Sequence, residues 1–131
     1  MSTGTPTSFA NRIAPWLSVR RGREAVDYYQ AAFGAIELHH HANEAGEIVA
    51  QLSVGGAEFW LADDPTLSPE TLGGGSVRMI LTVEDPDAVF ARAIAAGGTV
   101  VADVYEGHGW RIGRLADPFG HHWEVGRPLN G

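Results

Sequence analysis

Hydrophobic residues in the first half of this chain follow two patterns, one typical of a helix and one typical of strands. Within residues 22–33, Val26, Tyr29 and Phe33 recur at intervals of three and four, which places them on one face of a helix. Gly34 follows directly, at a position where glycine commonly ends a helix. Shorter apolar stretches separated by turn-forming residues are typical of strands. Such strands are expected at residues 13–19, 36–42, 47–54 and 57–62.

The same succession starts again after residues 64–76, a polar stretch rich in Gly and Pro that we interpret as a linker. Asp85 is a favourable N-terminal cap, and Pro86 suits the first position of a helix. Phe90 lies on the apolar face of this second helix, and Gly97 follows its end. Further strands are expected at residues 77–83, 99–105, 110–116 and 121–125.

The two halves also correspond residue by residue. A shift of 64 positions places Gly56 on Gly120 and Phe59 on Trp123. A matching order of elements with glycines in register indicates an internal duplication, and the alternative is a generic α+β domain with accidental symmetry. The prediction is an α+β fold in which two βαβββ modules form one structural domain. Its expected parts are a flexible N-terminal arm at 1–11, a first module at 12–63, the linker at 64–76 and a second module at 77–131.

Two segments of the chain carry a family resemblance. The first is WLSVRRGREAVDYYQAAFGA, and the second is GRLADPFGHHWEV, in which the turn Asp117-Pro118-Phe119-Gly120 leads into a strand with Glu124. They resemble the opening strand and helix and the closing hairpin of the vicinal oxygen chelate superfamily, which includes glyoxalase I, extradiol dioxygenases and bleomycin-resistance proteins. The resemblance implies the glyoxalase/bleomycin-resistance fold. In that fold each module forms half of a curved mixed sheet, and two modules, often from two chains of a dimer, enclose a cup-shaped site.

Metal-dependent members of this superfamily hold a divalent ion at four positions on the first and last strands of each module. The duplication maps these positions onto Ala14, Trp60, Arg78 and Glu124. Only Glu124 offers a ligand atom, and one carboxylate does not build a catalytic metal site. We therefore expect no metal cofactor. Side chains that replace ligands of a common ion should converge, so we predict that the Arg78 guanidinium hydrogen-bonds to the Glu124 carboxylate.

Strand alternation selects the other residues that should face the cup. Glu124 is the candidate catalytic residue, as a general base. The ligand-binding candidates are Trp16, Trp60, Arg78, Trp110 and His122. Packing in the core is the alternative for the two strand tryptophans Trp16 and Trp60, and a structural role is the alternative for His122. This lining suits an aromatic or cationic small molecule.

Three histidines at positions 39–41 are a separate candidate. His39 and His41 share one face of a strand, where a pair of imidazoles could bind zinc. The alternative interpretation is a solvated or partly buried strand face without a metal role. These histidines do not lie on a strand that carries the family's ligands.

The composition of the chain limits the classes of partner that it could bind. The 131 residues are 44% hydrophobic and carry a net charge of −7, which argues against nucleic acid as a partner. Apolar runs are too short to span a membrane, and the absence of cysteine fits a cytoplasmic protein. Because one chain of this size does not readily close an aromatic cup, we expect a homodimer.

Three functions follow from these residues. The first is a small-molecule binding protein with a cup-shaped, metal-free site, similar to bleomycin-resistance proteins. The second is a metal-dependent lyase or dioxygenase of the superfamily with substituted ligands. The third is a metal-free isomerase or lyase that uses Glu124 as its base, so the sequence leaves open whether the protein is an enzyme.

Overall fold

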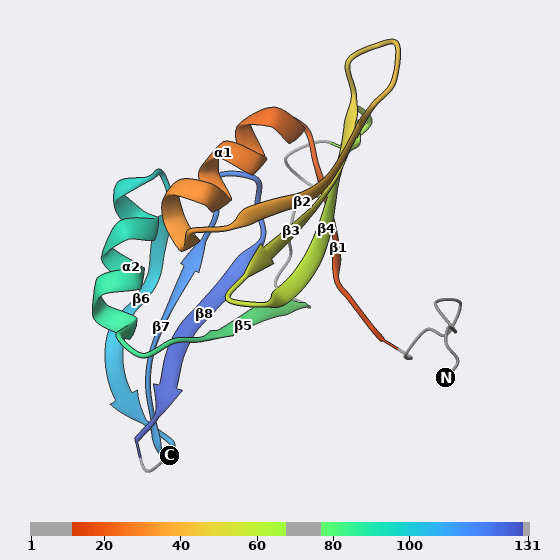
Figure 1. Cartoon of the computed structure of the whole chain (residues 1–131). Helices are drawn as coiled ribbons and strands as arrows, with labels where there is room; N and C mark the ends of the chain where they lie inside the picture. Colours follow the sequence, from red (N-terminus) through yellow and green to blue (C-terminus); the bar gives the residue numbers. More distant parts are fainter. Residues whose placement is uncertain (1–11, 68–76, 130–131) are drawn as a thin grey trace, which may run out of the picture.

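The computed structural model describes residues 12–67 and 77–129, and the predicted order of elements is confirmed in both halves (Figure 1). The first half contains β1 (Trp16–Val19), α1 (Gly22–Phe33), β2 (Ile36–Ala42), β3 (Ile48–Val54) and β4 (Ala57–Asp63). The second half contains β5 (Arg78–Thr82), α2 (Pro86–Ala95), β6 (Thr99–Gly107), β7 (Trp110–Ala116) and β8 (His122–Pro128). The expected N-terminal arm and most of the expected linker lie outside the described residues.

The strands form two four-stranded sheets with the same topology, β1-β4-β3-β2 and β5-β8-β7-β6. In each sheet the first strand pairs in parallel with the last, and the other pairs are antiparallel. Trp16 lies opposite Trp60 in the first sheet, and Ile80 lies opposite Glu124 in the second. Both pairs are related by the shift of 64 positions, so the register of the backbone hydrogen bonds supports the duplication inferred from sequence.

Local sequence signals set both helices. Gly34 adopts the left-handed conformation, with φ of 70°, and at the end of α1 its N–H donates to the carbonyl of Gln30 while the N–H of Ala35 donates to that of Tyr29. The Asp85 side chain accepts a hydrogen bond of 3.2 Å from the N–H of Ala88, so it caps α2 as predicted.

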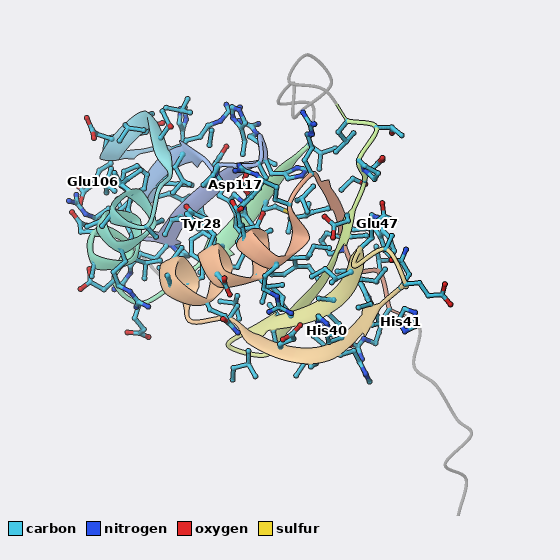
Figure 2. All side chains as sticks on the ribbon, turned by 90° about the horizontal axis from the view of Figure 1, so that it is seen from above. Tyr28, His40, His41, Glu47, Glu106 and Asp117 are labelled. Atoms are coloured by element: carbon cyan, nitrogen blue, oxygen red, sulfur yellow. The ribbon has the colours of Figure 1, made fainter. Side chains whose placement is uncertain are left out.

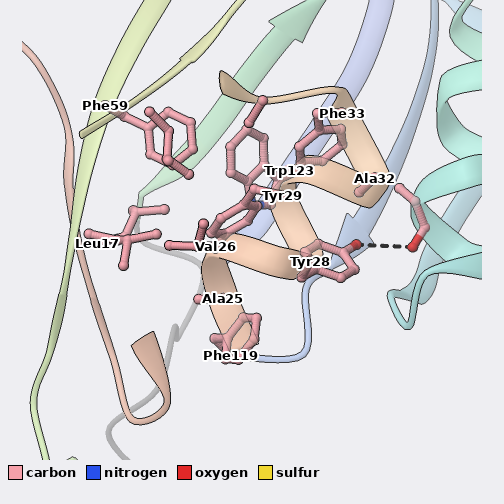
Figure 3. Close-up of a cluster of buried hydrophobic side chains, with 14 of the residues drawn as sticks. Leu17, Ala25, Val26, Tyr28, Tyr29, Ala32, Phe33, Phe59, Phe119 and Trp123 are labelled. Atoms are coloured by element: carbon pink, nitrogen blue, oxygen red, sulfur yellow. Dashed lines mark hydrogen bonds between the residues drawn. The ribbon is translucent and has the colours of Figure 1, made fainter. Parts of the chain in front are cut away.

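The hydrophobic core lies between the helices and one face of each sheet, and it is shared by the two modules (Figure 3). The ring of Tyr29 in α1 lies 5.4 Å from that of Phe59 in β4 and 5.5 Å from that of Trp123 in β8. The Tyr28 hydroxyl donates a 3.0 Å hydrogen bond to the carbonyl of Ala93 in α2. Helix α1 therefore holds the two halves together.

The opposite face of each sheet is left open by the helices. Trp16 on this face of the first sheet is 56% exposed, and Ile80 at the equivalent position of the second sheet is 58% exposed. Their neighbours Leu17 and Leu81 point to the other face and are buried. The alternation predicted for these strands therefore places the candidate site residues on open faces.

Strand bounds differ from the expectation at several ends, and so does the number of sheets. Strand β1 begins at Trp16, because Pro15 lacks an N–H for the ladder and only its carbonyl pairs with the Trp60 N–H, at 2.9 Å. The strands also form two sheets in place of one. At the edge of β1, the His121 side chain lies 2.9 Å from the carbonyl oxygen of Ser18, where a further strand would otherwise pair.

Among the described residues, no helix has the length and apolar character that crossing a membrane requires.

Candidate functional site

Arg78 and Glu124 meet on the open face of the second sheet. They lie on the adjacent parallel strands β5 and β8, and Arg78 Nη1 is 2.7 Å from Glu124 Oε2. The predicted convergence of the two head groups is thus confirmed, as an ion pair. The Glu124 side chain is 19% exposed and that of Arg78 is 46% exposed, so the carboxylate is the more enclosed partner.

Two adjoining cavities surround this ion pair, with volumes of about 280 Å³ and about 220 Å³. Both are lined by Glu124, Tyr105 and Ile112. The larger cavity is also lined by Ile80, Gly107, His108 and Trp110. The smaller one is also lined by Arg78, Val101, Ala102, Gly113 and Arg114. These two cavities together form the cup.

His122 lies beside the cup and is oriented by Arg114. Its Nδ1 accepts from Arg114 Nε at 3.0 Å and lies 2.8 Å from Arg114 Nη2, so the neutral ring carries its proton on Nε2. Burial, followed by the positive charge of Arg114, lowers the pKa of His122 below its ordinary value. His122 is therefore a neutral hydrogen-bonding residue at neutral pH.

Arg114, Tyr105 and Ile112 belong to the cup but were not among the residues selected from sequence. The alternation of residues 110–116 could have identified Ile112 and Arg114, because they share a face with Trp110. Tyr105 is harder to find, because β6 contains register shifts between Val100 and Tyr105. Simple alternation fails across such irregularities.

Trp16 and Trp60 occupy the open face of the other sheet, outside these two cavities. Their rings stack with centroids 6.4 Å apart and an interplanar angle of 22°. His39 continues the row, since its ring lies 6.3 Å from that of Trp60 at an interplanar angle of 2°. The structure thus divides the sequence-predicted residues. Arg78, Trp110 and Glu124 line the cup with His122 beside it, and the two tryptophans form a separate aromatic row.

The residues that the duplication maps onto the family's metal positions do not fit a divalent ion. Ala14 has no ligand atom, Trp60 presents a stacked indole, and Arg78 places a cation 2.7 Å from Glu124. Within residues 12–67 and 77–129, no three His, Asp or Glu side chains are grouped so that they could hold a metal ion.

The triple histidine lies away from the cup. His40 and His41 lie on β2 at the periphery of the molecule (Figure 2). The His40 ring pairs with Glu37, with Nδ1 and Oε2 2.8 Å apart. His39 points to the aromatic row, so neighbouring histidines of this run have different surroundings.

Comparison with known proteins agrees with this architecture. A family model described as a glyoxalase-like domain matches residues 16–126. The chain belongs to this family, and thereby to the vicinal oxygen chelate superfamily. An uncharacterised protein of Mycobacterium bovis is 40% identical over 127 residues, covering 89% of this chain and 83% of that protein. An uncharacterised protein of Arabidopsis thaliana is 32% identical over 114 residues, covering 76% of this chain and 68% of that protein.

Solved structures of the same fold include proteins from bacteria. The crystal structure of TioX from Micromonospora has a TM-score of 0.69 and 27% identity, with 89% of this chain and 95% of that chain covered. The fosfomycin resistance protein FosX from Listeria monocytogenes has a TM-score of 0.74 and 14% identity, with 92% and 95% covered. The likeness to FosX concerns the fold alone. Together these structures confirm the predicted α+β glyoxalase/bleomycin-resistance fold.

Proposed function

We propose that this protein binds a small organic molecule in the cup of the second sheet, without a bound metal ion. The observation that carries the proposal is the Arg78–Glu124 ion pair, which occupies the place of two metal-ligand positions of the superfamily. A guanidinium at this place supplies hydrogen-bond donors and permanent charge where other members would hold a cation. The cup is therefore chemically suited to direct recognition of a ligand by side chains.

The lining of the larger cavity supports an aromatic ligand. Trp110 and Tyr105 present flat rings, Ile80 and Ile112 present aliphatic surface, and Glu124 is the only formally charged residue among those that line it. Ligand sites are typically concave and mostly apolar, with a small number of polar groups that fix orientation. Cavities of about 280 and 220 Å³ accommodate a molecule with one or two rings.

Binding is favoured over catalysis because of the contact that Glu124 already makes. A general base needs a carboxylate that is free to accept a proton from the substrate. The Glu124 carboxylate is already paired with Arg78, at 2.7 Å. The role of Glu124 as a general base stays a prediction.

The proposal is tested with 2-naphthol, a neutral planar probe, by saturation-transfer NMR and calorimetry on protein treated with EDTA. Saturable binding is expected, and Trp110→Ala should weaken it about 5- to 10-fold, because the ring of Trp110 lines the larger cavity. Trp16→Ala is the matched control and should leave the affinity unchanged. Binding that is lost with Trp16→Ala but kept with Trp110→Ala, or that requires added metal, would refute the proposal.

A further inference from the structure

The two ends of the cup differ in character. The larger cavity has an aromatic and aliphatic lining, whereas the smaller one has two guanidinium groups, from Arg78 and Arg114. Tyr105, Ile112 and Glu124 line both cavities, so the cavities adjoin along these residues. A molecule that fills both would meet an apolar end and a basic end.

The charge of the cup is opposite in sign to that of the whole chain. Its lining contains two guanidinium groups and one carboxylate, that of Glu124, whereas the chain has a net charge of −7. His122 adds no positive charge, because its Nδ1 accepts the hydrogen bond of Arg114. A local excess of positive charge in a cleft attracts an anionic group.

We infer that the ligand of the cup is an aromatic acid, whose anionic group binds between Arg78 and Arg114 while its ring occupies the larger cavity. This inference rests on the function proposed above and specifies its ligand class. A guanidinium presents several N–H donors in one plane and matches the two oxygens of a carboxylate. The cationic ligand considered from the sequence fits these charges less well.

Glu124 would set the orientation of the bound ligand. Its carboxylate lies where the two cavities adjoin and would repel an anionic group placed at the aromatic end. Arg78 is already paired with the Glu124 carboxylate, whereas the partner of Arg114 is the neutral ring of His122, so the charge of Arg114 decides whether the smaller cavity attracts an anion. The inference therefore predicts that Arg114 distinguishes acids from neutral molecules of the same shape.

Three probes of one shape test this inference by calorimetry, namely 1-naphthoate, 1-naphthamide and 1-naphthylmethylammonium. We expect 1-naphthoate to bind about 10-fold more tightly than 1-naphthamide, and the ammonium compound to bind most weakly. Arg114→Met should reduce the affinity for 1-naphthoate far more than that for 1-naphthamide, so that the preference for the acid is lost. Retained amide binding shows that the variant is folded, and Arg78→Met is the second variant if Arg114→Met does not fold.

The control is Arg92→Met, which removes the same charge from the exposed surface of α2 and should keep the preference for the acid. Equal affinity for acid and amide, or tightest binding of the ammonium probe, would overturn the inference and leave the proposed binding function standing. Absence of binding by all three probes at millimolar concentration would overturn both.

Discussion

The Tyr29 hydroxyl lies 2.5 Å from Asp117 Oδ2 and donates a hydrogen bond to it. This bond joins α1 of the first module to the turn that precedes β8 of the second. Asp117 is only 4% exposed. Its Oδ2 also accepts from the indole N–H of Trp123 at 2.9 Å, and its Oδ1 accepts from the N–H groups of Phe119 and His121, each at 2.9 Å. Burial, followed by the charge of Asp117, raises the pKa of Tyr29 well above its ordinary range.

Replacement of Asp117 should be the most destabilising change at this junction. Asp117→Ala leaves four donors without their acceptor in a buried place, and we expect the free energy of unfolding to fall by roughly 3 kcal/mol or more. Urea denaturation followed by circular dichroism measures this.

The neighbouring tyrosines provide matched controls. Tyr29→Phe removes one hydrogen bond to a carboxylate and should cost about 1.5–3 kcal/mol, whereas Tyr28→Phe removes one bond to a carbonyl and should cost about 0.5–1.5 kcal/mol. Equal losses for all three variants would mean that Asp117 does not anchor the junction.

Sequence reasoning found the turn at Asp117 but not this network. The turn is a local signal of four consecutive residues, whereas Tyr29 is 88 positions away from Asp117 in the chain. The duplication does not help here, because Ser53 stands where the first module would have Asp117. Contacts between modules depend on how the two sheets pack, and the pattern of either module alone does not determine this.

The Arg78–Glu124 ion pair should contribute little to stability. Arg78 is 46% exposed, so water screens its charge, and exposed pairs typically contribute about 0–1 kcal/mol. A double-mutant cycle with Arg78→Met and Glu124→Gln should give a coupling energy of about 0.5–1 kcal/mol. A coupling energy above about 3 kcal/mol would show instead that the pair is shielded from water.

Tight binding of divalent metal at the family's position is not expected. Of the four mapped side chains, only Glu124 carries a ligand atom, and Arg78 is already bonded to it. Calorimetric titration of untagged protein with zinc or nickel should show no submicromolar one-to-one site that is removed by Glu124→Gln. A site removed by substitution of His39 or His41 would be a separate one on β2, and it would leave this prediction intact.

The candidate site was predictable where strands are regular and less so elsewhere. The proximity of Arg78 and Glu124 was predicted from the resemblance to the superfamily, because the duplication maps two of its metal positions onto these residues, and the adjacent strands β5 and β8 bring them together. The same reasoning grouped Trp16 and Trp60 with them. The structure separates the two tryptophans from the cup because each module forms its own sheet. Which open face adjoins which depends on packing between modules, as does the Tyr29–Asp117 contact.

Stability should fall as the pH is lowered through the titration of His122. Its pKa is lower in the folded protein than in the unfolded chain, where it is near 6.5, so the unfolded state takes up the proton first. The contribution of His122 is therefore complete above about pH 6.5 and is lost below that value. Urea denaturation at pH 8, 6.5 and 5.5 should show a smaller decrease for His122→Gln than for the wild type.

NMR titration of the histidine rings measures the same effect directly. The resonance that disappears in His122→Gln should titrate below pH 6.5 in the wild type. Arg114→Met should raise this pKa only partly, since burial is the larger cause. A His122 resonance that titrates above pH 6.5 would contradict the geometry in which Nδ1 accepts from Arg114.

We expect the protein to form a homodimer through its open sheet faces. Trp16 and Ile80 are more than half exposed, at 56% and 58%, and hold equivalent positions in the two modules. Exposed apolar surface of this kind on both faces is characteristic of an interface, and a two-fold axis would let each copy cover the same patch on the other. Sedimentation velocity at micromolar concentration should therefore show a dimer.

Charged substitutions on these faces provide the critical comparison. Trp16→Glu and Ile80→Glu should shift the protein to monomer, because each would bury a carboxylate in an apolar contact. Ala91→Glu, on the exposed surface of α2, adds the same charge on the helical side of the molecule and should leave the dimer intact. If Ala91→Glu dissociates the dimer and the two strand variants do not, the interface lies on the helices. A wild-type protein that sediments only as a monomer would show instead that the open faces remain exposed to solvent.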